Sequence, residues 1–211
     1  MSAGAEQRAA ARRIVAAARH HFFTHGFRGV TMDDLAAALG MSKKTLYACF
    51  PGKTALLEAV IRDKFRTVEA DLERITAAAP ADALGALRAL LACVQAHTEE
   101  IQPPFVRDIQ REAPEMFKVV ESRRRELIRR YFGKLLGEGR RAGVIRKDIP
   151  TRLIMEILLG AVQAIMNPPK MAELGLTPKS GFSAIVAVVL EGALAPAARS
   201  KPQAAPLAER K

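Results

Sequence analysis

A short helical segment interrupted in its middle is the feature that most constrains this chain. The stretch TMDDLAAALGMSKKTLYACF, from Thr31 to Phe50, has helical signals on both sides of a Gly-Met-Ser sequence. Thr31 can cap a helix whose first turn is acidic, where the positive end of the helix dipole favours acids. Gly40 can take the left-handed conformation that ends a helix, and Ser42 can cap the next one. We therefore expect two short helices joined by a turn of about three residues, which is a helix-turn-helix.

The second short helix is expected to present a basic and polar face. Leu46 and Phe50 are four residues apart and can anchor one side of this helix in a core. In an arbitrary protein a lysine pair on a helix is more often a solvated face. The helix-turn-helix setting favours DNA binding instead, because a basic, aromatic-bearing face suits a phosphate-lined groove. The outward residues are Lys43, Lys44, Thr45, Tyr47 and Ala48.

The composition of the whole chain favours an all-α fold. The 211 residues are 49% hydrophobic, with no Trp and only 5% aromatic residues. Abundant Ala and Leu suit packing of helix on helix, whereas sheets favour β-branched and aromatic residues. The formal net charge of +11 attracts polyanions, so it concerns the partners of the protein rather than its fold.

Hydrophobic periodicity predicts about nine helices. One precedes the helix-turn-helix, from about residue 6 to 25, and longer ones begin near residues 53, 82, 114, 151 and 180. The proline pairs at 103–104 and 168–169 are interpreted as breaks. The helices expected over 151–166 and 180–194 are apolar nearly all round, more than the interior of a monomer of this size absorbs. This pattern favours a homodimer that pairs the two C-terminal helices across a two-fold axis.

The sequence offers no sign of a membrane span, a metal site or catalysis. The longest apolar run, Leu153–Met166, is shorter than the ~20 residues that a span needs, so we expect a cytoplasmic protein without a membrane partner. Cys49 and Cys93 lie far apart and are interpreted as reduced thiols. His21 and His25 are four residues apart, but no thiol or carboxylate stands beside them at ligand spacing, which favours head packing or a phosphate contact over a metal. Without a GxSxG elbow, a phosphate loop or HExxH, we expect no enzyme and no cofactor.

The segment ESRRRELIRRYFGKLLGEGRR, Glu121 to Arg141, is basic enough to be a second nucleic-acid patch. Its glutamates alternate with arginines three and four residues apart. That alternation favours a salt-bridged solvent face.

From Arg13 to Val60 the chain carries many residues at fixed offsets that resemble the DNA-binding head of the TetR family of bacterial transcriptional repressors. The resemblance implies a head over 1–52 and a helical body for effector binding and dimerisation over 53–194. The composition of residues 195–211, rich in Ala, Pro and Lys, favours a disordered tail. The matching residues are Gly26, Phe27, Thr31, Leu35, Ala36, Gly40, Ser42, Leu46, Tyr47, Phe50, Lys53, Leu56 and Leu57.

The resemblance also implies roles for individual residues of the head. Thr31 corresponds to a residue that holds a phosphate, Tyr47 to a tyrosine that hydrogen-bonds the DNA backbone, and Lys53 to a lysine that clamps another phosphate. The residues that would face the major groove are Ser42, Lys43, Lys44, Thr45 and Ala48.

The implied function is that of a dimeric repressor that binds a palindromic operator and is released by a small, mainly apolar ligand. The helix that begins at Lys53 would carry the signal from body to head. The alternative is a constitutive DNA-binding protein without an effector, which would need no cavity in its body. The expected pocket residues are Phe65, Leu87, His97, Phe105, Phe117, Val120, Tyr131, Leu159 and Gln163, with His97, Tyr131 and Gln163 as the polar ones.

Overall fold

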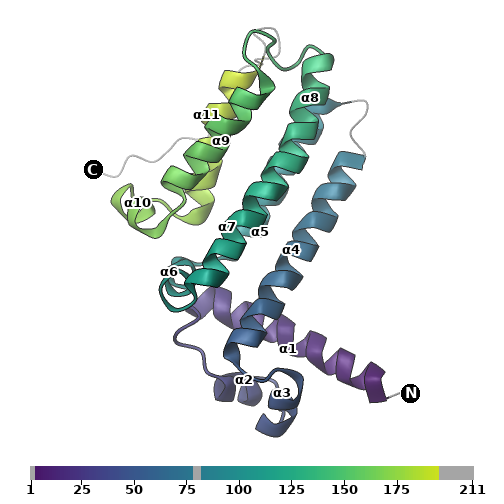
Figure 1. Cartoon of the computed structure of the whole chain (residues 1–211), viewed down its shortest axis with the longest axis vertical. Helices are drawn as coiled ribbons and strands as arrows, with labels where there is room; N and C mark the ends of the chain where they lie inside the picture. The colour runs from purple at the N-terminus through teal and green to yellow at the C-terminus, as the bar shows by residue number, and fades with distance from the viewer. Residues whose placement is uncertain (1–2, 78–81, 195–211) are drawn as a thin grey trace.

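The computed structural model describes residues 3–77 and 82–194, and it is built from helices (Figure 1). Because α7, the π-helical turn η1 and α8 follow one another as one helix, these ranges contain ten helices and no strand. The all-α fold with an N-terminal helix-turn-helix is therefore confirmed. In chain order the elements are α1 (Ala3–His25), α2 (Met32–Ala38), α3 (Lys43–Cys49), α4 (Lys53–Ala77), α5 (Ala83–Glu99), α6 (Pro103–Glu112), α7 (Pro114–Leu127), η1 (Ile128–Phe132), α8 (Gly133–Arg141), α9 (Thr151–Ile165), α10 (Pro168–Glu173) and α11 (Pro178–Ala193).

Local capping produces the corner between α2 and α3. The Thr31 hydroxyl accepts a hydrogen bond from the Asp34 amide at 3.1 Å, and the Asp34 carboxylate accepts one from the Thr31 amide at 2.8 Å. This capping box satisfies two amides that the start of a helix leaves without a partner. Gly40 then takes a positive φ of 60°, and the Ser42 hydroxyl accepts from the Thr45 amide at 3.1 Å. Both helix ends are thus set by residues within the corner itself.

The head is fixed to the body by its own core and by α6. Leu46 of α3 is fully buried, and Phe50 packs partly buried against the same core. Gly26 ends α1 with a φ of 89°, and a Cβ there would lie 2.5 Å from the Asp108 carboxylate of α6. That carboxylate accepts a hydrogen bond from the Arg28 amide at 2.9 Å. A glycine is therefore required where the head meets α6.

Helix α4 belongs to both parts of the molecule. It leaves the head, runs the length of the body and lies beside α5 and the long α7–α8 helix, while α9 and α11 form the opposite side (Figure 1). Leu56, Leu57 and Val60 of α4 lie in the head core, whereas Leu72 lies in the body core. The packing along α4 is thus continuous from the head core to the body core. The tail expected over 195–211 falls outside the described residues.

Two short helices begin at the proline pairs that the sequence analysis interprets as breaks. Pro103 opens α6 and Pro168 opens α10. The first turn of a helix tolerates proline, because the missing amide would have no intrahelical partner there and the fixed φ suits a helix. Together with the eight helices placed by residue above, these two make the ten observed in the described residues.

The arginines between 121 and 141 form ion pairs, as the alternation with glutamate predicts, but most of the pairs cross between helices. Arg123 contacts Glu69 at 2.6 Å, and Arg130 contacts Glu69 at 2.9 Å, which ties the α7–η1 segment to α4. Arg129 reaches Glu156 of α9 at 3.4 Å. These contacts favour the salt-bridged interpretation of the segment over a second nucleic-acid surface.

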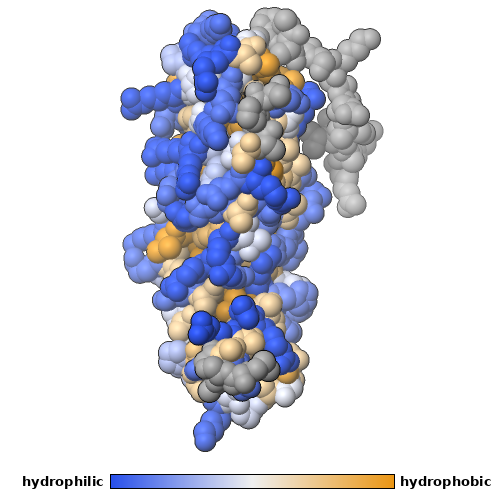
Figure 2. Space-filling model, turned by 90° about the vertical axis from the view of Figure 1, so that its right-hand side faces the viewer, coloured by the Kyte–Doolittle hydropathy of each residue, from blue (hydrophilic) through white to orange (hydrophobic). Residues whose placement is uncertain are grey.

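The face on the α4 side is largely hydrophilic, with small apolar patches (Figure 2). Within the described residues, no helix combines the length and the hydropathy that crossing a membrane requires.

Candidate DNA-binding head and body cavity

The residues expected to contact DNA lie together on the outer side of α2 and α3. Leu46 is fully buried and fixes the orientation of α3, so that the other side of this helix faces solvent. Tyr47 is 48% exposed, an unusual exposure for a large aromatic side chain. The exposed residues of this surface are Thr31, Ser42, Lys43, Lys44, Thr45, Tyr47 and Ala48.

The two lysines of α3 differ in their surroundings. Lys43 Nζ lies 2.6 Å from the Asp33 carboxylate of α2, which raises the pKa of Lys43 by a hydrogen bond and by charge. Lys44 is exposed, and among the described residues it has no ion-pair partner. Lys44 can therefore reach a base edge without giving up an existing contact, whereas Lys43 would have to leave Asp33.

Lys53 is held at the edge of the head rather than extended into solvent. Its Nζ donates to the Arg28 carbonyl at 3.2 Å and lies 4.4 Å from the centre of the Phe27 ring. Partial burial lowers the pKa of Lys53. The ring and the carbonyl place the ammonium group beside the N-terminus of α4, where the helix dipole also favours an anion such as a phosphate.

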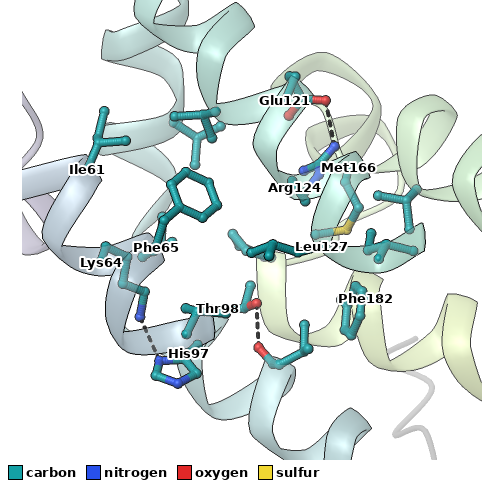
Figure 3. Close-up of a pocket in the computed structure, with 18 of the residues that line it drawn as sticks. Ile61, Lys64, Phe65, His97, Thr98, Glu121, Arg124, Leu127, Met166 and Phe182 are labelled. Carbon is teal, nitrogen blue, oxygen red and sulfur yellow. Dashed lines mark hydrogen bonds and ion pairs between the residues drawn. The ribbon is translucent and has the colours of Figure 1, made fainter. Parts of the chain in front are cut away.

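A cavity of about 190 Å³ lies in the body between α4, α5, α6 and α7, with α9–α11 closing it (Figure 3). Its wall is mainly apolar, and α4 contributes Ile61, Phe65 and Val68 to it. The polar or charged side chains in the wall are Lys64, His97, Thr98, Glu121 and Arg124.

Each charged or hydroxyl group in the wall already has a partner inside the protein. Arg124 Nη2 lies 2.6 Å from the Glu121 carboxylate, and the Thr98 hydroxyl donates to the Val94 carbonyl at 2.8 Å (Figure 3). Lys64 is paired with Glu100 and with His97. The cavity thus offers apolar contacts and compensated charges, and it has no uncompensated charge among its described wall residues.

Of the residues expected in the pocket, the structure brings Phe65, His97, Phe105 and Val120 to this cavity. Leu87 instead lines a much smaller gap, of about 20 Å³, between α5, η1, α8, α9 and α11.

The other four expected pocket residues lie elsewhere. The Tyr131 hydroxyl turns to α4 and donates to Glu73 at 3.2 Å, and Gln163 is exposed and accepts from Arg125 at 3.0 Å. Phe117 packs against the head core, and Leu159 lies in the body core. Helical periodicity shows which side of a helix turns inward, but it does not show which neighbouring helices leave space between them.

Lys64 is the residue of this site that sequence reasoning missed. It is only 6% exposed and stands on the apolar face of α4, three residues after Ile61 and four before Val68. A lysine at such a position is the signal that could have revealed it, because a buried lysine needs partners. Burial, and secondarily the nearby Arg19 guanidinium, lower the pKa of Lys64 to about 7, whereas the charges of Cys93 and Asp71 act in the opposite direction.

Glu100 links this part of the cavity wall to the head. It follows α5 directly, and its carboxylate accepts from Arg19 of α1 at 2.8 and 3.0 Å. The same carboxylate pairs with Lys64 of α4. One acidic residue therefore joins the first helix of the head, the connecting helix and the cavity wall.

Comparison with known proteins agrees with this geometry. Residues 14–60 match the model of bacterial regulatory proteins of the tetR family. A segment of 45 residues, 20% of this chain, is 49% identical to the uncharacterized HTH-type transcriptional regulator YvaF of Bacillus subtilis (strain 168). The aligned segment spans 24% of that relative's length.

Solved structures resemble the whole fold. A TetR-family transcriptional regulator from Agrobacterium tumefaciens superposes with a TM-score of 0.68 at 20% identity, covering 90% of this chain and 100% of that one. A complex of SmeT with triclosan gives a TM-score of 0.61 at 17% identity, covering 96% of this chain and 100% of that one.

The capped helix-turn-helix on a helical body defines the class as DNA-binding transcriptional regulators. Residues 14–60 carry the DNA-binding head that the tetR family model describes, and the chain shares the fold of solved TetR-family regulators.

Proposed function

We propose that the protein is a ligand-responsive repressor that binds a palindromic operator as a homodimer. A compact, mainly apolar molecule in the body cavity would release it. The observation that carries this proposal is the cavity itself, because its wall includes Ile61 and Phe65 of the helix that begins at the head. A constitutive DNA-binding protein would need no such space. The structure of SmeT with triclosan supports ligand binding in this fold.

The size and lining of the cavity define the class of ligand. Its volume of about 190 Å³ is smaller than the ~300–1,000 Å³ of pockets that hold drug-sized molecules. Its charged groups are already paired, so an ionic ligand would have to break an internal ion pair. We therefore infer a neutral ligand of one or two rings or a short hydrocarbon chain.

The outer faces of α9 and α11 support a dimer. Leu153 and Ile157 on α9 are each 50% exposed, and Val188 on α11 is 74% exposed. The exposed small residues on the same two helices are Gly160, Ala164, Ala184 and Ala187. Small side chains let helices of two subunits approach closely. A two-fold axis at this face would place two heads on successive major grooves, about 34–36 Å apart.

The effect of a ligand requires a difference in affinity between two arrangements of the heads. A ligand that binds the released arrangement more tightly shifts the equilibrium by that difference, typically ~1–3 kcal/mol. Occupation of the cavity would push on the α4 wall and change the separation of the two α3 helices.

Lys44→Ala is expected to relax the preference for particular bases, because the free ammonium of Lys44 can donate to guanine O6 and N7. Lys53→Ala is the matched comparison: it should weaken binding to all sequences alike and lower the slope of log K against log salt by about one. The measurement is selection of bound sites from random DNA together with a salt titration. An unchanged sequence preference in Lys44→Ala would contradict the base-reading role.

Val94→Phe is expected to abolish ligand binding, because the larger side chain on α5 leaves too little of the cavity for a ligand of one or two rings. The substitution adds less volume than such a ligand and should push less on α4, so operator affinity should stay within about 3-fold of the wild type. The ligands are compounds that raise the melting temperature of the wild type in a thermal-shift screen of small apolar and aromatic molecules. Val119→Phe is the control, because Val119 is 54% exposed on α7 and lies outside the cavity.

Release of operator DNA by the screened compounds completes this test. The wild type and Val119→Phe should both release DNA, and Val94→Phe should not. If no compound both stabilises the wild type and displaces DNA, ligand release is rejected and the constitutive DNA-binding protein becomes the better interpretation.

A further inference from the structure

A thiol, an imidazole and a carboxylate converge between α4 and α5. Cys93 and His97 are four residues apart on α5 and so share one face of the helix, and Asp71 approaches from α4. One potential ligand atom from each residue lies within 4.8 Å of the other two. All three side chains are partly buried, in the space beside the body cavity.

The hydrogen bonds of this cluster do not involve the thiol, which packs partly buried against the body core. His97 Nε2 lies 2.9 Å from the Asp71 carboxylate, and His97 Nδ1 lies 3.0 Å from Lys64 Nζ. A helix-to-helix contact through this imidazole and carboxylate would need no cysteine. The third group, with a donor atom that suits transition metals, is what distinguishes the cluster from an ordinary hydrogen-bonded pair.

We propose that Asp71, Cys93 and His97 bind a divalent transition-metal cation such as Zn²⁺ and that the bound cation links α4 to α5. Zinc takes thiolate sulfur at ~2.3 Å, imidazole nitrogen at ~2.0–2.1 Å and carboxylate oxygen at ~2.0–2.2 Å, in a tetrahedral arrangement. Such bonds place ligand atoms about 3.3–3.8 Å apart. Side-chain rotations that move the three ligand atoms by about 1 Å would therefore bring them into position around an ion. Three protein ligands leave the fourth position for water or another small ligand.

The donor set determines which cation fits. A thiolate and an imidazole select zinc, cobalt or similar ions over magnesium and calcium, which prefer oxygen. On binding, the sulfur–metal bond replaces the sulfur–hydrogen bond, and the thiol proton leaves to solvent. The imidazole changes tautomer, so that its proton moves from Nε2 to Nδ1, the Nε2 lone pair binds the metal in place of the hydrogen bond to Asp71, and Lys64 keeps Glu100 as its partner.

This site differs from the sequence expectation of reduced thiols without a metal. Asp71 is 22 residues before Cys93, too far for any short ligand motif, and only the packing of α4 on α5 joins them. The position also matters for regulation, since α4 connects the cavity with the head. The metal proposal is nevertheless independent of the ligand proposal, because it concerns binding of the cation alone.

The test uses the full chain, stripped of metal with a chelator and titrated with Co²⁺ as a spectroscopic substitute for Zn²⁺. The wild type is expected to bind one Co²⁺ per chain with a thiolate-to-cobalt charge-transfer band. Cys93→Ala should lose that band and bind Zn²⁺ at least about 100-fold more weakly. Loss of a residue that only hydrogen-bonds to a metal ligand costs up to about 100-fold in affinity, and loss of a ligand itself should cost no less. Cys49→Ala is the matched control and should behave as the wild type.

Asp71→Asn separates metal ligation from a merely structural role. It should keep the charge-transfer band but lower the Zn²⁺ affinity by about 10-fold or more. Zn²⁺ should also raise the melting temperature of the wild type and of Cys49→Ala, but not of Cys93→Ala. Cobalt bound without a thiolate band would place it elsewhere, for example on His21 and His25, and would overturn the proposal. Absence of bound cation after dialysis, or an unchanged band in Cys93→Ala, would overturn it equally.

Discussion

Ile157→Glu is expected to convert the proposed dimer into a monomer and to weaken operator binding by about 100-fold or more, because two linked heads gain about 10²–10⁴ in avidity over one. Ile157 is 50% exposed in the single chain, so the substitution leaves the fold of the subunit intact. In the two-fold interface the same position would be buried, and two glutamates would meet there without partners. Sedimentation equilibrium measures the association, and titration of operator DNA measures the affinity.

Val119→Glu is the matched control for this result. Val119 has a similar exposure, 54%, but lies on α7, away from α9 and α11. This variant should remain dimeric and bind the operator as the wild type does. A dimeric Ile157→Glu protein with full operator affinity would show that the outer faces of α9 and α11 are not the interface.

The head could be predicted from the sequence because local residues determine it. Thr31, Asp34 and Ser42 form their capping bonds with partners three residues away, and Gly40 supplies the left-handed turn within the same corner. Such short-range signals do not depend on the rest of the fold. The burial of Leu46 also followed from its spacing within α3.

The body cavity could be predicted only in part, since it depends on how separate helices pack. Phe65 and Phe105 were expected in it from their apolar character, but Tyr131 has the same kind of signal and turns to Glu73 instead. The charged groups were missed, because a lysine in a helix is ordinarily interpreted as exposed. Lys64 is tolerated in the interior because Glu100 and His97, 36 and 33 residues away, lie beside it.

Glu100→Ala is expected to lower the free energy of unfolding by about 2 kcal/mol. Removing one partner of a fully buried ion pair costs about 3–5 kcal/mol, and the cost should be smaller here because the Glu100 side chain keeps partial contact with water. Its side chain is 33% exposed, but that of Lys64 is only 8% exposed and would lose its acidic partner. Urea unfolding at a fixed protomer concentration measures the change. Glu99→Ala is the control: Glu99 pairs with Lys179 at the surface, where an ion pair contributes only about 0–1 kcal/mol.

The same substitution is expected to weaken operator binding by about 5-fold or more, the lower end of typical coupling between sites. Arg19 would lose the carboxylate that holds α1 to the end of α5 and would keep only Asp63, at 3.9 Å. The heads would then be less firmly fixed relative to the body. Operator titration with Glu99→Ala as reference measures this effect, and unchanged affinity would contradict an anchoring role for Glu100.

The double variant Lys64→Met/Glu100→Ala separates the two effects of Glu100. Methionine removes the buried charge and keeps most of the volume of the lysine, and replacing a buried ion pair by apolar groups is often close to neutral. The double variant should therefore regain most of the lost stability. It should not regain operator affinity, because Arg19 still lacks its partner directly after α5. Recovery of both would show that the buried charge alone, and not the contact between Arg19 and Glu100, governs the position of the head.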